Sequence, residues 1–140
     1  MEVIATNLSN YQVEITSGRH RLLADELPDV GEDAGPDPYA LLLSALGACK
    51  VITVEMYARR KGWSLEKVQV RLNTYKVHAK DCEDCESDPD AKVDIIECRI
   101  NLRGDLSPEQ VDRLVEISER CPVHRTLTSE TKIRTQLVGD

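Results

Sequence analysis

The feature that most constrains this chain is one long helical segment in its first half. Apolar residues recur at helical spacing from Pro38 to Lys61. Asp37 and Pro38 are a typical N-cap and first helical residue, and Gly62 is a typical helix stop. At a rise of about 1.5 Å per residue this helix would be about 36 Å long. In a chain of 140 residues such a helix must be central to the fold or be shared with a second subunit.

One stripe of this helix is predicted to face the core, and Cys49 lies in the middle of it. A buried cysteine is commonly a small core residue without chemistry, so position alone leaves a structural role open. The stripe consists of residues three or four positions apart: Tyr39, Leu42, Leu43, Leu46, Cys49, Thr53, Met56 and Tyr57.

Shorter elements are predicted on both sides of the long helix. Alternating apolar and polar residues indicate strands at 11–15, 22–23, 68–77, 96–102 and 133–137. A second helix begins at Ser107 and Pro108, where Gln110 completes a capping box, and runs toward Cys121. The order of strands, long helix, hairpin, short helix and strand predicts a single α+β domain over residues 1–140.

Composition and charge exclude several classes of function. The chain has 25 acidic and 18 basic residues, and the net charge of -7 disfavours nucleic acids and anionic membranes as partners. The first residues lack a basic and apolar leader, and we find no run of about 18 apolar residues. We therefore expect no signal peptide, no membrane span, no cofactor and a cytoplasmic location.

The five cysteines are an odd number in a chain without export signals, so we expect mostly free thiols and either catalysis or metal binding. Cys121 precedes Pro122 and can be the N-cap of a short helical turn, with His124 and Arg125 adding positive charge. The alternative is a hinge with solvated basic residues. Together, Cys49 and Cys121 are candidates for a peroxidatic thiol, which attacks a peroxide, and a resolving thiol, which then forms a disulfide with the oxidised first cysteine.

Cys82 and Cys85 form the remaining motif, a single Cys-x-x-Cys. Such a motif can be half of a zinc site, a redox pair or a coincidence. Six acidic residues between positions 81 and 90 disfavour the thiolate form and therefore a fast redox couple. We interpret the segment as a solvated hairpin tip and keep Cys82 and Cys85, with His78 as a third ligand, only as weak metal candidates.

Three segments of the chain resemble the OsmC/Ohr family of thiol peroxidases, in the OsmC-like subgroup. They are 18–26 (GRHRLLADE), 35–49 (GPDPYALLLSALGAC) and 121–127 (CPVHRTL), in the family's order. The resemblance implies an OsmC-like fold, in which curved antiparallel sheets enclose a long central helix. It also implies an intertwined homodimer with active sites at the subunit interface.

The resemblance also implies an activity in oxidative-stress defence. A cysteine on the long helix, here Cys49, attacks an organic hydroperoxide or hydrogen peroxide, and the later cysteine, here Cys121, forms a disulfide with it. A dithiol reductant, often a lipoyl protein, then restores both thiols. An arginine of the first hairpin assists, which Arg19 matches best, with Arg21 as the alternate.

One residue departs from the family pattern. The best-studied branch has a glutamate just after the helix-opening proline, which orients that arginine, whereas this chain has Tyr39. Two alternative hypotheses stay open, and this departure motivates the first of them. The first is a metal- or ligand-binding protein that keeps the fold without efficient peroxidase activity. The second is a thiol redox sensor whose slow oxidation changes partner binding.

Overall fold

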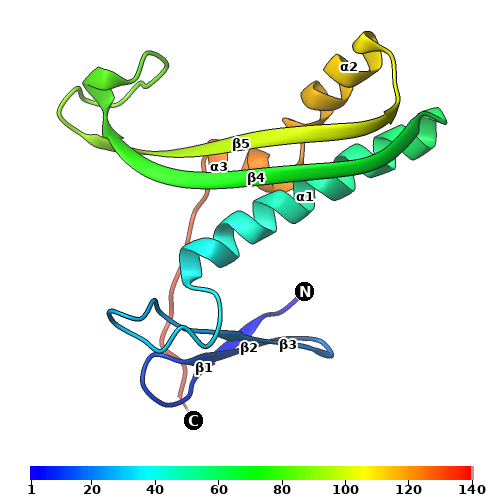
Figure 1. The fold of residues 1–140 in the computed structure, drawn as a ribbon. Coiled ribbons are helices and arrows are strands. Elements are labelled where there is room, and N and C mark those ends of the chain that lie inside the picture. The colour runs from blue at the N-terminus through cyan, green and yellow to red at the C-terminus, as the bar shows by residue number, and fades with distance from the viewer. Residues whose placement is uncertain (140) are drawn as a thin grey trace. The chain divides into compact units, whose positions relative to one another are not determined.

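The structure is a computed structural model, and it describes residues 1–139 (Figure 1). The chain separates into two compact units, Met1–Ala45 and the part from Leu46 onward. Helix α1 (Pro38–Lys61) begins in the first unit and continues into the second. The two units are described separately below.

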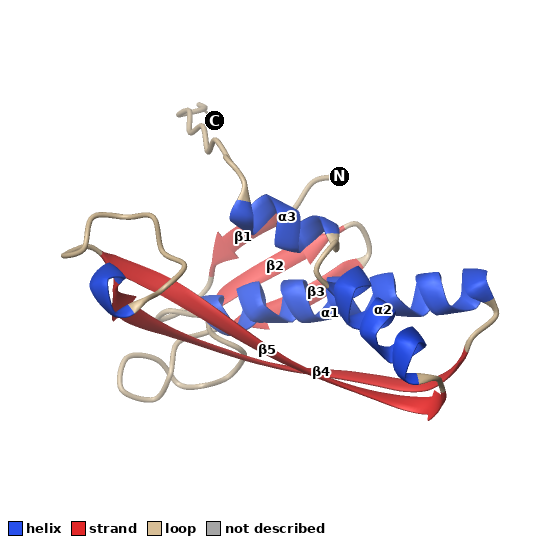
Figure 2. Cartoon of the chain, turned by 90° about the horizontal axis from the view of Figure 1, so that it is seen from above, coloured by secondary structure: helices blue, strands red, loops and turns tan. Residues whose placement is uncertain are grey.

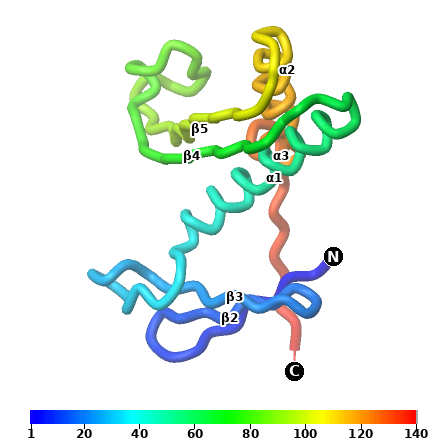
Figure 3. The backbone as a smooth tube through the Cα atoms, turned by 45° about the vertical axis from the view of Figure 1, so that its right-hand side comes forward, coloured from blue at the N-terminus to red at the C-terminus, as the bar shows by residue number. Residues whose placement is uncertain are grey.

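The first unit contains a three-stranded antiparallel sheet of β1 (Ile4–Asn7), β2 (Val13–Ser17) and β3 (His20–Ala24), in that order. Figure 3 shows the tight connection from β2 to β3. This turn is at Gly18, which has a positive φ of 57° that favours glycine. The sequence pattern predicted β2 and β3 but not β1, whose four residues are all exposed and show no apolar alternation.

The loop that leads to α1 is organised around one buried carboxylate. Asp25 is 2% exposed and accepts backbone N–H bonds from Glu26, Glu32 and Ala34. These bonds, with that of Ala34 the strongest influence, lower the pKa of the Asp25 carboxyl below its usual value. The carboxylate therefore fixes the course of the chain shortly before the helix begins.

Helix α1 has the bounds that the sequence predicts. The Asp37 side chain accepts a bond of 3.2 Å from the Ala40 backbone N–H, so Asp37 caps the helix as expected. At the other end Gly62 has a φ of +70°, the left-handed conformation that ends many helices.

The second unit consists of the remainder of α1, a long antiparallel hairpin and two short helices. Strands β4 (Ser64–His78) and β5 (Lys92–Asp105) run side by side along their whole length (Figure 2). A 3₁₀ turn, η1 (Ala79–Asp81), begins the loop between them, and α2 (Pro108–Ser118) and α3 (Pro122–Thr128) follow. The predicted capping box of α2 is present, because Ser107 and Gln110 each bond the other's backbone N–H.

The core of this unit lies between α1, α2 and the hairpin. Its fully buried centre is Val54 and Ala58 of α1 and Leu114 of α2. Partly buried apolar side chains surround this centre, namely Tyr57, Trp63, Leu65, Val68, Ile100, Leu102 and Leu106. Closer to Cys49, a Cβ at Gly47 would lie 2.9 Å from Leu72 Cδ1, so the glycine lets β4 approach the helix closely.

The predicted core stripe of α1 is wrong in its outer members. The helix buries Leu46, Gly47, Lys50, Val54 and Ala58 within the chain. Tyr39 and Met56 of the predicted stripe are 56% and 66% exposed. The helix is apolar on more than one face, so its sequence pattern does not specify which face meets the core of the same chain.

Two further expectations are corrected. The predicted strand at 133–137 is wrong, because these residues form no strand and Ile133 and Leu137 are 90% and 100% exposed. An alternating pattern forms a strand only where a neighbouring strand is present to pair with it. In addition, α1 is long and apolar enough to cross a membrane by length and composition, with a mean hydropathy of 1.5 in its most apolar stretch, so the expectation that no such segment exists is wrong. One such helix is weak evidence of a membrane span, because core helices pass the same test.

Candidate thiol site

The two cysteines singled out in the sequence meet in the second unit. Cys49 is half-buried on α1, and Cys121 is fully buried just before α3. Cys49 is one of the groups that raise the pKa of the Cys121 thiol, so the two side chains are neighbours in the folded chain. Both are free thiols in this structure. The arrangement therefore brings two thiols that are far apart in sequence into the same part of the second unit.

Cys121 is the N-cap of α3, as the sequence predicts. Its Sγ accepts a 3.3 Å hydrogen bond from the His124 backbone N–H, and Pro122 is the first helical residue. Desolvation is the main reason that the pKa of the Cys121 thiol is raised, and its contact with Cys49 adds to the rise. The His124 N–H and the positive charge of Lys50 act in the opposite direction. The thiol form is thus favoured until something stabilises the thiolate further.

Lys50 is the residue that sequence reasoning missed. It follows Cys49 directly, yet it is only 2% exposed. Its Nζ donates to the Ser118 carbonyl oxygen at 2.9 Å and lies 3.0 Å from His124 Nδ1. The available signal was its position, because Lys50 is the single charged residue in α1 before Glu55. A lone charge in an apolar helix has to find polar partners or solvent.

The basic residues after Cys121 separate into two environments. The His124 ring contacts Lys50 through Nδ1, and its Nε2 lies 3.8 Å from Glu119 Oε2. The Arg125 side chain is exposed, and its backbone N–H donates a hydrogen bond to the Cys121 carbonyl oxygen. The cation nearest this part of the site is therefore Lys50, with His124 linking it to the surface.

A cavity of about 380 Å³ adjoins His124. Most of its lining is apolar and comes from α1, β5 and α3, with two carboxylates at one side. The lining residues are Leu46, Asp84, Asp94, Ile95, Ile96, Cys98, His124, Leu127 and Thr128. Cys98 alternates with Ile96 and Ile100 along β5, a pattern that predicts a core residue, but this prediction is wrong because Cys98 is exposed and borders the cavity. The alternating pattern correctly places Cys98 on a strand, β5. Only the tertiary packing determines which residues of the hairpin are covered by the helices.

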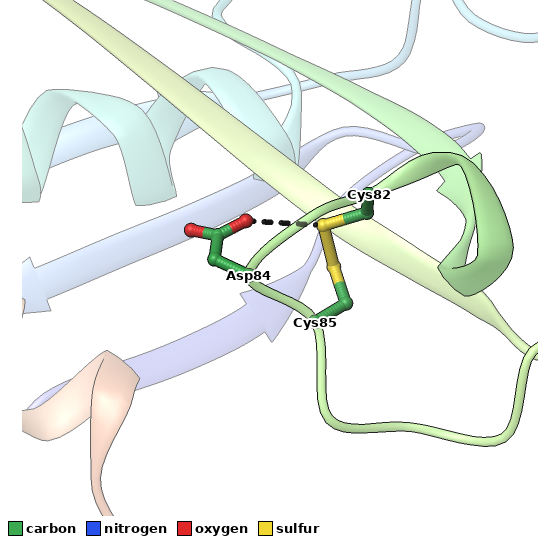
Figure 4. The surroundings of a disulfide bond; sticks show 3 residues. All are labelled: Cys82, Asp84 and Cys85. Carbon is green, nitrogen blue, oxygen red and sulfur yellow. Dashed lines mark hydrogen bonds between the residues drawn. A yellow bond between two sulfur atoms is a disulfide. The ribbon is translucent and has the colours of Figure 1, made fainter.

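Cys82 and Cys85 are joined by a disulfide with a Cα–Cα distance of 5.5 Å (Figure 4). The other three cysteines are free thiols, so the expectation of mostly free thiols is confirmed and this pair is the exception. The Cys82 Sγ lies 3.2 Å from Asp84 Oδ1, and the three potential ligand atoms of Cys82, Asp84 and Cys85 lie within 4.8 Å of one another. A disulfide sulfur is not a thiolate ligand, so these residues could hold a metal only after reduction.

The predicted arginines lie in the first unit. Arg19 is exposed in the turn between β2 and β3, and Arg21 forms an ion pair with Glu14 on the neighbouring strand. Tyr39, at the position of the family glutamate, is exposed in the first turn of α1. The assignment of Arg19 to the site stays a prediction.

The fold and the cysteine pair define an α+β thiol protein with antiparallel sheets and a central helix. The family model described as OsmC-like protein matches residues 31–136, and the chain belongs to this family. The chain has no significant match among curated proteins.

Solved structures show the same fold. An OsmC-like protein from Mycoplasma pneumoniae is 20% identical with a TM-score of 0.71, over 90% of this chain and 85% of that one. An organic hydroperoxide resistance protein OsmC from Legionella pneumophila is 20% identical, with a TM-score of 0.64 and coverage of 91% and 90%. The organic hydroperoxide resistance protein OhrB of Bacillus subtilis is 15% identical, with a TM-score of 0.61 and coverage of 91% and 89%.

Proposed function

We propose that this protein is a thiol-dependent peroxidase that reduces organic hydroperoxides or hydrogen peroxide through Cys49 and Cys121. The single observation that supports the proposal is that Cys49 lies close enough to Cys121 to raise the pKa of its thiol. Family membership and the hydroperoxide resistance proteins among its structural relatives support a role in the response to peroxides. The setting is proposed to be the cytoplasm.

The reaction has three steps. The Cys49 thiolate attacks one peroxide oxygen, the O–O bond breaks, and the alkoxide leaves and takes a proton to become an alcohol. The Cys49 sulfenic acid then reacts with the Cys121 thiol, so that a disulfide and water form. An external dithiol finally reduces the disulfide by thiol–disulfide exchange and becomes a disulfide itself.

The roles of the two cysteines follow from their exposure. Cys49 is half-buried and can meet a substrate from outside, whereas Cys121 is fully buried. Arg19 remains a proposed helper for the first step. The cavity beside His124 has leucine and isoleucine side chains in its lining next to two aspartates, and its size fits the apolar part of an organic hydroperoxide.

The proposal is tested by intact mass after one equivalent of cumene hydroperoxide. The Cys82→Ser/Cys85→Ser double variant is the suitable background, because it leaves only Cys49, Cys98 and Cys121 as sources of a new disulfide. We expect a loss of two hydrogens, mapped by peptide analysis to Cys49–Cys121. In the same background Cys121→Ser should instead accumulate a sulfenic acid that dimedone traps. A disulfide that maps to Cys98, or no reaction with peroxide, would refute the proposed pair.

We further propose that the protein acts as a homodimer that covers α1. Only 17% of the most apolar stretch of this helix is buried within the chain, and Ile52 and Met56 are 57% and 66% exposed. Apolar helix faces of this extent are typical of subunit interfaces.

The dimer is tested by sedimentation of the wild type and of Met56→Asp. The wild type should have twice the 15.7 kDa mass of the chain. The variant should shift toward the monomer, because it places a charge in an apolar contact. Circular dichroism serves as the control for folding. A wild type that stays monomeric at micromolar concentration would contradict the dimer.

A further inference from the structure

We propose that Lys50, held in place by His124, is the positioning residue of the resolving step, in which it stabilises the thiolate of Cys121. This inference rests on the peroxidase function proposed above. It goes beyond that function because it identifies the cation that stabilises the thiolate of the second cysteine. The observation behind it is a buried chain of contacts that begins at Cys121 and ends at the surface.

The first link is the burial of Lys50. A lysine that is 2% exposed loses most of its hydration, and two protein acceptors replace the lost water. One is the carbonyl oxygen of Ser118, at the C-terminal end of α2, and the other is His124 Nδ1. A cation is favoured at the carbonyl end of a helix. These contacts use two of the three N–H donors of an ammonium group.

The second link is His124, which contacts both partners of the proposed interaction. Its backbone N–H donates to Cys121 Sγ at 3.3 Å, and its ring nitrogen Nδ1 lies 3.0 Å from Lys50 Nζ. With Lys50 as donor, Nδ1 is the acceptor, so the ring proton is on Nε2, the atom that lies 3.8 Å from Glu119 Oε2. One residue therefore fixes the thiol and the cation relative to each other.

The third link is the effect of this charge on Cys121. Burial is the largest influence and, with the neighbouring Cys49, disfavours a Cys121 thiolate, whereas the His124 N–H and, more weakly, the Lys50 charge favour it. Further titratable groups near Lys50 are the His124 ring, Cys98 of β5 and Glu119 between α2 and α3. Glu119 is 61% exposed and acts through solvent. Lys50 is thus the buried positive charge among these groups.

The step balances without another reactant. Cys121 loses its proton as its sulfur attacks the sulfur of the Cys49 sulfenic acid, and the S–O bond breaks. The departing hydroxide takes that proton and becomes water, while the ammonium of Lys50 is unchanged. Burial and the neighbouring sulfur both disfavour a negative charge on Cys121. The positive charge of Lys50 offsets this cost and stabilises the thiolate that attacks.

The test compares Lys50→Met with the wild type after one equivalent of cumene hydroperoxide, in the Cys82→Ser/Cys85→Ser background. Stopped-flow with mass analysis should show disulfide formation at pH 7 slowed by about tenfold, which corresponds to a shift of about one pH unit in its pH profile toward alkaline pH. Lys50→Arg should restore part of the rate, because it keeps the charge. A Lys50→Met protein with the wild-type rate and pH profile would overturn the proposal.

Two further variants separate this proposal from a failure of the peroxidase itself. In a Cys121→Ser background, Lys50→Met should form the dimedone-trapped sulfenic acid at nearly the rate of Cys121→Ser alone. A large loss there would assign Lys50 to the first step and contradict the proposal. His124→Leu keeps the backbone bond to Cys121 and removes the ring contact to Lys50, so it should also slow disulfide formation. This second route remains informative if Lys50→Met does not fold.

Discussion

Replacing Cys49 with serine should lower peroxide turnover by at least about a thousandfold, because a serine hydroxyl is a far weaker nucleophile than a thiolate and cannot form a disulfide. The assay is consumption of cumene hydroperoxide with a small dithiol as reductant. In this variant no sulfenic acid forms at position 49, so Cys121 has nothing to attack. The intact mass after peroxide should therefore show no loss of two hydrogens.

The matched control for this prediction is the Cys82→Ser/Cys85→Ser double variant. It removes two sulfurs and the loop disulfide, and it leaves the free thiols of Cys49 and Cys121 unchanged. It should turn over peroxide at about the wild-type rate. If Cys49→Ser retained activity and the double serine variant lost it, the reactive thiol would lie in the loop between β4 and β5.

Leu114→Ala should be the most destabilising single truncation in the core of the second unit. Leu114 is 0% exposed and packs with Val54 and Ala58, so its truncation removes apolar contacts and leaves a cavity between α1 and α2. We expect the free energy of unfolding to fall by about 2–5 kcal/mol. Urea denaturation followed by circular dichroism measures this loss.

Val115→Ala is the neighbouring control, because Val115 is 37% exposed on the same helix. Its loss of stability should be clearly smaller than that of Leu114→Ala, since solvent already reaches the side chain. Equal losses for the two variants would mean that Leu114 is not at the centre of the core.

Local chemistry along the chain was sufficient to predict several elements closely. Asp37 with Pro38, and Gly62 after the basic end, determine both ends of α1 through capping and a left-handed turn. Ser107 with Gln110 determines the start of α2 in the same way. Such signals involve residues within a few positions of each other, so no tertiary contact is needed to interpret them.

The pair of Cys49 and Cys121 was predicted only in part from the residues themselves. Position alone left Cys49 as a core residue, and the late Cys-Pro motif together with the family resemblance raised it to a reactive thiol. The proximity of the two side chains comes from tertiary packing, because it depends on how α3 returns to α1 after the hairpin and α2.

Amino-acid order alone therefore determined the helix ends, the hairpin, the capped second helix and the cysteine that caps α3. Tertiary structure decided which face of α1 is buried, that Lys50 is inside with Ser118 and His124 as partners, and that Cys98 is exposed. The physical reason is range. Caps and turns are short-range interactions within the sequence, whereas a buried charge is stable only if distant segments supply its acceptors, and these acceptors exist only once the chain has folded.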